Sequence, residues 1–390
     1  MSTSLPTLIR LRAIQNLTRQ LFSNLSDIHY RLQFHHDLSP AGWYLGRGIF
    51  IENYWLHEVL QNDDQFTADK SLFFSEHCPP AQRGPRLPSL KATLKEISAQ
   101  QDDNDLLLLY KTPPLSDNPL FKDEFIENYI IQQYALLYEQ TYRVFNQIAL
   151  KKHALDKKNH PYEPQTPLKS QALIKNISHV KAATYLVGGE LPLSFDNELP
   201  AHEIHLEDFF IANTPVTNGQ YLLFIEEGGY QNKNLWCDEG WKWRKENTIQ
   251  HPEHWHQNPQ QQWYATHQLG AIDLNINDAV YGLSHYEASA FANWAGARLP
   301  HEHEWETAAR LEVLKQTTHV WEWCNNVYSP YDEFKAFPEH DGGHLKYDEN
   351  HYILKGASPH TRPEIKRASF RNAHLPHQRH IFAGLRLVFK

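Results

Sequence analysis

The sequence contains few cysteines, and their placement argues against two kinds of cross-linked protein. Only three occur in 390 residues, Cys78, Cys237 and Cys324. They are an odd number, lie far apart and form no C-x-x-C pair, so neither a disulfide framework nor a cysteine-rich zinc site is predicted. We expect reduced thiols. For Cys324, which follows "VWEW", we expect a buried structural thiol, because no neighbouring base would activate it as a nucleophile.

An excess of positive charge and long apolar runs are also lacking. The formal net charge of −9 at pH 7 gives no reason to expect a nucleic-acid or anionic-membrane partner. No uninterrupted apolar run approaches membrane-spanning length and no basic-plus-apolar signal opens the sequence, so we expect a cytoplasmic protein. Aromatic residues are abundant at 13%, and 390 residues with 41% hydrophobic content are enough for two domains, each with its own core.

The first 152 residues have the apolar spacing of helices. Further helices are predicted at 41–61, 89–100 and 124–152, with the proline-rich loop "HCPPAQRGPRLPS" between the first two of these. Three or four helices joined by one long irregular crossover make a bundle. A single long helix is predicted near the start, where apolar residues recur every three or four positions: Leu8, Leu11, Ile14, Leu17, Leu21, Leu25, Ile28 and Leu32.

The chain changes character after a polar, proline-punctuated stretch at 153–172, which is typical of a linker. From 173 to 390, Gly, Asn, Trp and short apolar runs dominate. Helical pattern is convincing only in "PVTNGQYLLFIEEGG" and "SHYEASAFANWAG", and short strands are predicted in "YILKGAS" and "AGLRLVF". The predicted fold class is α+β, a helical bundle followed by an irregular, loop-rich domain.

Six segments of the second domain occur in the order seen in the formylglycine-generating-enzyme-like, or sulfatase-modifying-factor, domain. They are "TPVTNGQYLLFIEEGGY", "LWCDEGWKWR", "LSHYEASAFANWAGARLPHEHEWETAAR", "VWEWCNN", "YILKGAS" and "SFRNAHLPHQRHIFAGLRL". The "DEGW" segment and the ending "RHIFAG" are most similar to the sulfoxide synthases of ergothioneine and ovothiol biosynthesis. Those enzymes place a DinB-like helical bundle before this C-type-lectin-like domain, and "SPAGWYLGRGIFIENYWL" and "QRGPRLPSL" resemble that bundle.

The resemblance implies a non-haem iron held by three histidines in active members, one from "LGH" or "LAH" and two from H-x3-H-x-E. Here the matching residues are Arg47, Gln133 and Leu137, and Glu139 matches the final glutamate. Arginine stays protonated and leucine has no lone pair, so neither can bind a metal. We therefore predict no metal and no cofactor at this position.

Arg47 lies within an apolar helix, where an unpaired charge would cost several kcal/mol or more. We interpret it as filling the space and charge of the absent iron. The expected partner is the carboxylate of Glu139, with Glu52 as second choice. The alternative is that Arg47 reaches solvent along the domain interface.

Other positions of the expected pocket are changed as well. The segment "FRNAH" keeps Asn372 but has His374 where a carboxylate is common, and Gln378 and Arg379 stand at the usual arginine pair. Glu339 matches the approximate position of the catalytic tyrosine. Glu339 and His374 are therefore the candidates for any metal-independent catalysis.

Two features bear on the substrates of related enzymes. Arg83 and Arg86 match arginines that contact the carboxylates of the thiol substrate, and they are predicted to bind an anion. The cysteine pair that formylglycine-generating enzymes carry after "GGS" is missing from "KGASPHTRPEIKRASFRN", so copper-dependent cysteine oxidation is not expected.

The 25 histidines form local clusters. These are "FHHD" at 34–37, "HPEHWH" at 251–256, "HEHEWE" at 301–306 and "HLPHQRH" at 374–380. Ligand type without geometry is weak evidence for a metal, and we expect His301 and His303 to open a helix after "RLP". The group His374, His377 and His380 is the best placed, close to the presumed pocket.

Two main hypotheses follow. The first is an iron-free relative of the sulfoxide synthases that is non-catalytic or repurposed and binds a small polar or anionic molecule, through Arg83, Arg86 and Asn372, or a protein partner. The alternative is an active, oxygen-dependent sulfoxide synthase that forms a C–S bond between a histidine derivative and a thiol. It requires Fe(II) on relocated ligands such as His35, His57 or the 374–380 group.

Overall fold

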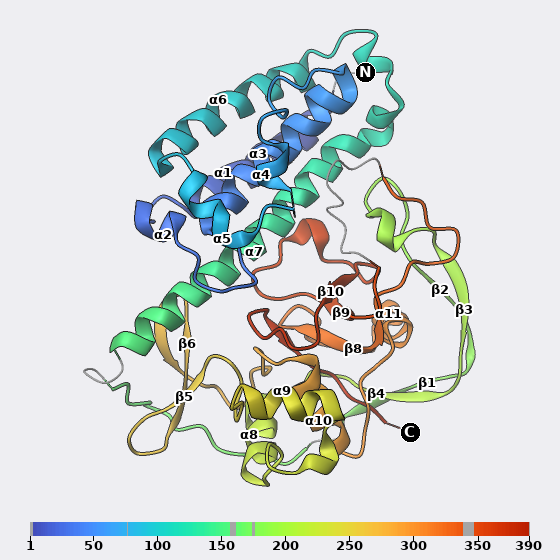
Figure 1. The fold of residues 1–390 in the computed structure, drawn as a ribbon. Helices are drawn as coiled ribbons and strands as arrows, with labels where there is room; N and C mark the ends of the chain where they lie inside the picture. Colours follow the sequence, from blue (N-terminus) through green and yellow to red (C-terminus); the bar gives the residue numbers. More distant parts are fainter. Residues whose placement is uncertain (1–2, 76, 157–160, 174–175, 338–346, 390) are drawn as a thin grey trace.

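The computed structural model describes residues 3–389 except 76, 157–160, 174–175 and 338–346 (Figure 1). Glu339 lies outside these residues. The helices of the N-terminal part are α1 (Leu5–Gln20), α2 (Asp27–Arg31), α3 (Ala41–Asn53), a π-helical continuation of α3 (Tyr54–Val59), α4 (Ser71–Phe74), α5 (Pro80–Arg83), α6 (Leu90–Leu109) and α7 (Phe125–Asp156). Short 3-10 turns occupy Gly84–Arg86, Leu115–Asp117 and Pro119–Glu124.

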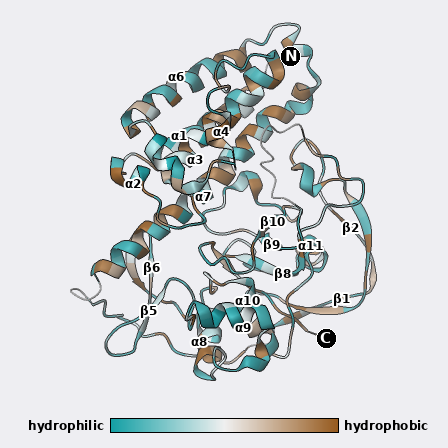
Figure 2. Cartoon of the chain, viewed as in Figure 1, coloured by the Kyte–Doolittle hydropathy of each residue, from teal (hydrophilic) through white to brown (hydrophobic). Residues whose placement is uncertain are grey.

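Helices α1, α3, α6 and α7 pack as the predicted bundle. Helix α3 is apolar on nearly every side and is buried among its neighbours, as such a helix must be. Its glycines allow close packing, since a Cβ at Gly48 would lie 2.5 Å from Tyr134 of α7. Helices α1, α6 and α7 carry both hydrophobic and hydrophilic residues (Figure 2). None of the described helices is long and apolar enough to cross a membrane.

The prediction of one long helix over residues 8–32 is wrong. Helix α1 ends at Gln20, and Ser26 starts α2 by accepting a hydrogen bond from the His29 N–H. Ile28 and Leu32 are 67% and 49% exposed, so they continue the apolar spacing without facing the core. The later helices are longer than predicted, since α6 ends at Leu109 and α7 continues past 152 to Asp156.

The second domain consists of small sheets, short helices and long loops. Its four-stranded sheet has the order β10-β9-β8-β11, in which only β11 is parallel to its neighbour. The other sheets are β1-β4-β12, β2-β3 and β5-β6-β7. The strands are β1 (Ile177–Val180), β2 (Ala183–Val187), β3 (His202–Leu206), β4 (Phe209–Ala212), β5 (Trp255–Gln257), β6 (Trp263–His267), β7 (Gly270–Asp273), β8 (Trp321–Val327), β9 (Tyr352–Gly356), β10 (Asn372–His374), β11 (Ala383–Gly384) and β12 (Val388–Phe389).

Four α-helices belong to the second domain, α8 (Asn218–Glu226), α9 (Asp238–Glu246), α10 (His285–Trp294) and α11 (Glu302–Arg310). The α+β class and the two predicted helical segments are confirmed. Helix α9 was not predicted. Its N-cap is a cysteine, which is not one of the usual capping residues, and the Cys237 Sγ accepts a hydrogen bond from the Gly240 N–H. Short 3-10 turns lie at Asp196–Glu198, Lys233–Leu235 and Pro363–Ile365.

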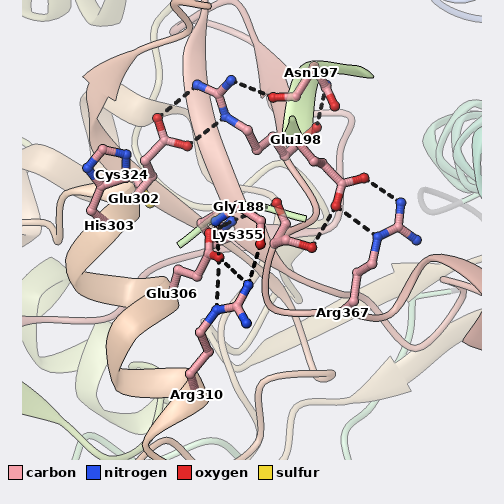
Figure 3. Close-up of polar contacts among 12 residues, drawn as sticks. Gly188, Asn197, Glu198, Glu302, His303, Glu306, Arg310, Cys324, Lys355 and Arg367 are labelled. Atoms are coloured by element: carbon pink, nitrogen blue, oxygen red, sulfur yellow. Dashed lines mark hydrogen bonds and ion pairs between the residues drawn. The ribbon is translucent and has the colours of Figure 1, made fainter. Parts of the chain in front are cut away.

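Buried ion pairs hold the irregular second domain together (Figure 3). Glu306 of α11 accepts from Lys355 of β9 at 3.1 Å. Glu198 pairs with Arg367 in the same view. Since a buried charge without a partner is costly, such pairs restrict how the loops can be arranged. Cys324 is buried nearby, and burial raises the pKa of its thiol well above the usual range, which agrees with a structural thiol.

Candidate functional site

A cleft of about 200 Å³ lies between α7 and the second domain. Helix α7 runs along that domain and contacts β6 and the turn at Pro363–Ile365. Four polar residues of α7 line the cleft, Gln133, Glu139, Gln140 and Arg143. The second domain contributes the polar side chains of Asn197, Arg371, Asn372 and His374 and the aromatic rings of Phe195, Trp321, Tyr328 and Phe370. The structure thus brings together Gln133, Glu139, Asn372 and His374, which the sequence analysis had singled out separately.

Glu139 joins the two domains at the cleft. It is 2% exposed, and its Oε1 accepts hydrogen bonds from Arg143 Nη2 at 3.1 Å and from Trp321 Nε1 at 2.7 Å. Its Oε2 accepts from the Thr361 hydroxyl. The prediction that Glu139 pairs with Arg47 is therefore wrong. The carboxylate of Glu139 pairs instead with Arg143, which lies one turn further along α7.

A chain of hydrogen bonds leads from Arg143 across the domain interface. Arg143 Nη1 donates to His374 Nε2 at 2.9 Å, so His374 carries its proton on Nδ1 and donates it to Gln378 Oε1 at 2.9 Å. Gln378 Nε2 then donates to Asp37 Oδ2 at 3.2 Å. Burial, followed by the neighbouring Arg143 charge, holds the pKa of His374 well below its usual range. His374 is therefore a neutral linking residue at neutral pH.

The three positions expected to hold iron differ in their surroundings. Leu137 is 4% exposed in the bundle core, and Gln133 is half-buried at the cleft. Arg47 is half-buried, donates to the Phe74 carbonyl and lies 5.3 Å from the centre of the Trp43 ring. Since a guanidinium cannot coordinate a cation and leucine has no donor atom, this set of side chains does not fit iron.

The other expected partner of Arg47, Glu52, is engaged within the bundle. Its carboxylate accepts hydrogen bonds from Tyr134 at 2.7 Å, Asn104 at 2.8 Å and Gln15 at 3.1 Å. These neutral donors do not offset its complete burial, which raises the pKa of Glu52 to about 7. The pairing of Arg47 with Glu52 is therefore also wrong.

The raised pKa of Glu52 predicts a loss of stability with rising pH. The native state binds a proton that the unfolded state releases above its pKa near 4.5, so the unfolding free energy falls from about pH 4.5 to 7. We expect Glu52→Gln to gain stability relative to the wild type by about 1–3 kcal/mol between pH 5 and pH 8. Urea unfolding at several pH values measures the difference. Equal pH slopes for the two proteins would contradict this assignment.

The arginines predicted to bind an anion lie elsewhere. Arg83 is buried, with its donors on Ser39 Oγ and the carbonyls of Ser75 and Cys78 and its plane 3.9 Å from the centre of the Trp43 ring. Arg86 is exposed and lines a separate cavity of about 330 Å³ on the bundle. These contacts give Arg83 a structural position in the loop before α6, and neither arginine lines the cleft.

The segment that ends the chain contributes both lining and linking residues. Asn372 lines the cleft, while its Oδ1 accepts from the Ala373 N–H. Arg379 is half-buried, and its Nε lies 3.0 Å from Glu287 Oε2. Two other arginines line the cleft, Arg371, which pairs with Glu302 at 2.7 Å, and Arg143, which the sequence analysis missed. The available signal was its spacing of four residues from Glu139 on one helix face.

The histidine clusters have different environments. His301 caps α11 as expected, and its Nδ1 accepts from the His303 N–H at 3.2 Å. His57, considered as a relocated metal ligand, lies 2.7 Å from Asn104 Oδ1 of α6. His254 is buried and stacks on Tyr281.

Comparisons with known proteins agree with this architecture. The family model described as a Sulfatase-modifying factor enzyme 1-like domain matches residues 165–318 and 316–390. The hercynine oxygenase of Mycobacterium tuberculosis is 30% identical over 242 residues, which cover 51% of this chain and 56% of that protein. The formylglycine-generating enzyme of Thermomonospora curvata is 29% identical over 197 residues, covering 45% of this chain and 63% of that protein.

A third relative, the inactive C-alpha-formylglycine-generating enzyme 2 of Mus musculus, is 31% identical over 159 residues, covering 38% of this chain and 50% of that protein. This chain thus spans about half the length of the hercynine oxygenases that it matches. The chain belongs to the family with a Sulfatase-modifying factor enzyme 1-like domain and is a relative of the hercynine oxygenases within it.

Proposed function

We propose that this chain is a repurposed, non-catalytic relative of the hercynine oxygenases that holds no iron at the family position and binds a small carboxylate-bearing molecule in the cleft beside α7. One observation carries the proposal. The positions of the three expected ligands hold Arg47, Gln133 and Leu137, and of these Gln133 lines a polar cleft that also contains Arg143.

The chemistry of the ligand follows from groups that the described residues leave unsatisfied. Arg143 is 6% exposed, and its Nε has no hydrogen-bond partner among them, although both of its terminal nitrogens donate. Asn197 Oδ1 is a buried acceptor that also has no hydrogen-bond partner among the described residues. Buried polar groups normally have partners, so a ligand that accepts from Arg143 and donates to Asn197 would complete the cleft. An amino acid or a similar small zwitterion offers both groups.

The size of the cleft further limits which ligands can fit. At about 200 Å³ it is smaller than the usual sites for drug-sized ligands, which start at roughly 300 Å³. Trp321, Phe195 and Phe370 provide apolar surface beside the polar groups. The cleft therefore suits a molecule of amino-acid size with a flat or apolar side chain.

Thermal unfolding with a panel of amino acids, betaines and small dicarboxylates tests the proposal. We expect at least one compound to raise the Tm of the wild type at millimolar concentration, because a ligand specific for the native state stabilises it. Arg143→Lys keeps the charge beside Glu139 but removes the Nε donor, and should weaken this binding at least tenfold. Arg310→Lys, which alters another arginine four residues from a glutamate, should leave it unchanged.

Metal analysis provides a second test of the proposal. After anaerobic loading with Fe(II) and desalting, we expect no iron whose binding depends on Gln133 or Arg47. Stoichiometric iron that is lost in Gln133→Ala would overturn the proposal. So would the failure of every compound in the panel to stabilise the wild type.

A further inference from the structure

Two histidine segments from opposite ends of the chain meet beside the domain interface. The loop after α2 carries His35, His36 and Asp37, whose potential metal-binding atoms all lie within 4.8 Å of one another. The C-terminal segment brings His380 against them. Its ring centre lies 4.4 Å from that of His35, and its Nδ1 lies 3.8 Å from Asp37 Oδ2.

His380 is the observation that points to a ligand. Its side chain is 3% exposed, and its Nδ1 is buried without a hydrogen-bond partner among the described residues. A buried polar atom in this condition calls for an explanation, and a cation bound beside the Asp37 carboxylate would provide one. His374, six residues earlier, differs because both of its ring nitrogens have partners.

The carboxylate is held in place from outside the cluster. Gln378 Nε2 donates to Asp37 Oδ2 at 3.2 Å, as expected for a hydrogen-bonded carboxylate ligand. His36 Nε2 lies 3.4 Å from Asp37 Oδ1, with its side chain 77% exposed. His35 Nδ1 accepts from the Asp37 N–H at 3.2 Å, a contact that coordination through this nitrogen would replace.

We propose that His35, Asp37 and His380 bind one divalent transition-metal ion, with Zn²⁺ the best match, and that His36 or water completes the coordination. Two imidazoles and one carboxylate form a recognised ligand set for zinc. Tetrahedral zinc places its ligand atoms about 3.3 Å apart, so Asp37 Oδ2 and His380 Nδ1, which lie 3.8 Å apart, would move closer by about half an ångström. The His380 ring would also rotate toward the group formed by His35, His36 and Asp37. The ion would fasten the loop after α2 to the last segment of the second domain.

Zinc titration of the full chain, without an affinity tag and stripped with a chelator, tests the site against a chromophoric competitor. We expect one equivalent of Zn²⁺ to bind with a Kd at or below the micromolar range and to raise the Tm by several degrees. His380→Ala and the more conservative Asp37→Asn should each weaken binding at least thirtyfold. The exposed His205 provides the control, since His205→Ala should bind as the wild type does.

Each alternative result has a clear meaning. Failure of the wild type to bind stoichiometric zinc, or wild-type affinity in folded Asp37→Asn, would overturn the proposal. Preferential retention of Fe²⁺ over Zn²⁺ would overturn the zinc assignment. Gln378 connects Asp37 to His374 of the cleft, so His380→Ala, which changes no residue of that chain, is the variant that separates the two proposals. Loss of zinc binding in His380→Ala and loss of ligand binding in Arg143→Lys are separate outcomes.

Discussion

Replacing Glu139 with alanine is expected to lower the unfolding free energy by about 3–5 kcal/mol. The substitution removes the acceptor for Arg143, Trp321 and Thr361 at once. Arg143 would then remain buried without its carboxylate, and an uncompensated buried charge accounts for most of a loss of this size. Because two of the three donors belong to the second domain, the bundle and that domain should also separate more readily. Equilibrium unfolding in urea measures the first effect, and limited proteolysis of the linker region measures the second.

A double-variant cycle distinguishes the loss of the ion pair from the loss of packing. Glu139→Leu combined with Arg143→Leu should recover part of the stability, since no unpaired charge remains. Glu96→Ala is the control, because Glu96 pairs with Lys70 on the surface, where an ion pair contributes about 0–1 kcal/mol. A loss below about 1 kcal/mol for Glu139→Ala would contradict the role of Glu139 in joining the domains.

The sequence predicted those elements whose apolar spacing and packing coincide. Helices α3 and α7 and strand β9 were found because their patterns reflect real burial. The helix predicted over 8–32 failed because Ile28 and Leu32 continue the spacing of α1 while lying outside the core. Apolar spacing alone does not distinguish a helix face that packs in the core from apolar residues that recur by chance.

The parts of the site that lie within one sequence motif were predictable. Gln133 and Glu139 share a helix, and their cleft includes Asn372 and His374 as the family resemblance implied. The partner of Glu139 was not predictable from an assumed iron geometry, since the carboxylate pairs with Arg143, four residues along the same helix. The contact between Asp37 and Gln378 spans 341 positions of sequence, and only the completed fold brings such residues together.

The second large effect is expected at Glu306, whose alanine variant should also lose about 3–5 kcal/mol (Figure 3). Its Oε1 accepts from the Gly188 N–H at 2.8 Å and from Arg310 Nε at 3.0 Å, and its Oε2 accepts from Lys355 Nζ at 3.1 Å. Both Glu306 and Lys355 side chains are fully buried. Alanine would leave the Lys355 ammonium with only the Ser369 carbonyl, which offers no opposite charge.

Replacing Lys355 should lower the unfolding free energy less than replacing its partner Glu306. This difference tests the interpretation. Lys355→Met leaves Glu306 with Arg310 and the Gly188 N–H, so its charge stays paired, and we expect a loss of about 1–2 kcal/mol. Glu246→Ala removes an exposed pair with Lys242 at the same four-residue spacing and should change the unfolding free energy by less than about 0.5 kcal/mol. Equal losses for Glu306→Ala and Lys355→Met would show that packing, rather than the unpaired ammonium, determines the stability of this part of the core.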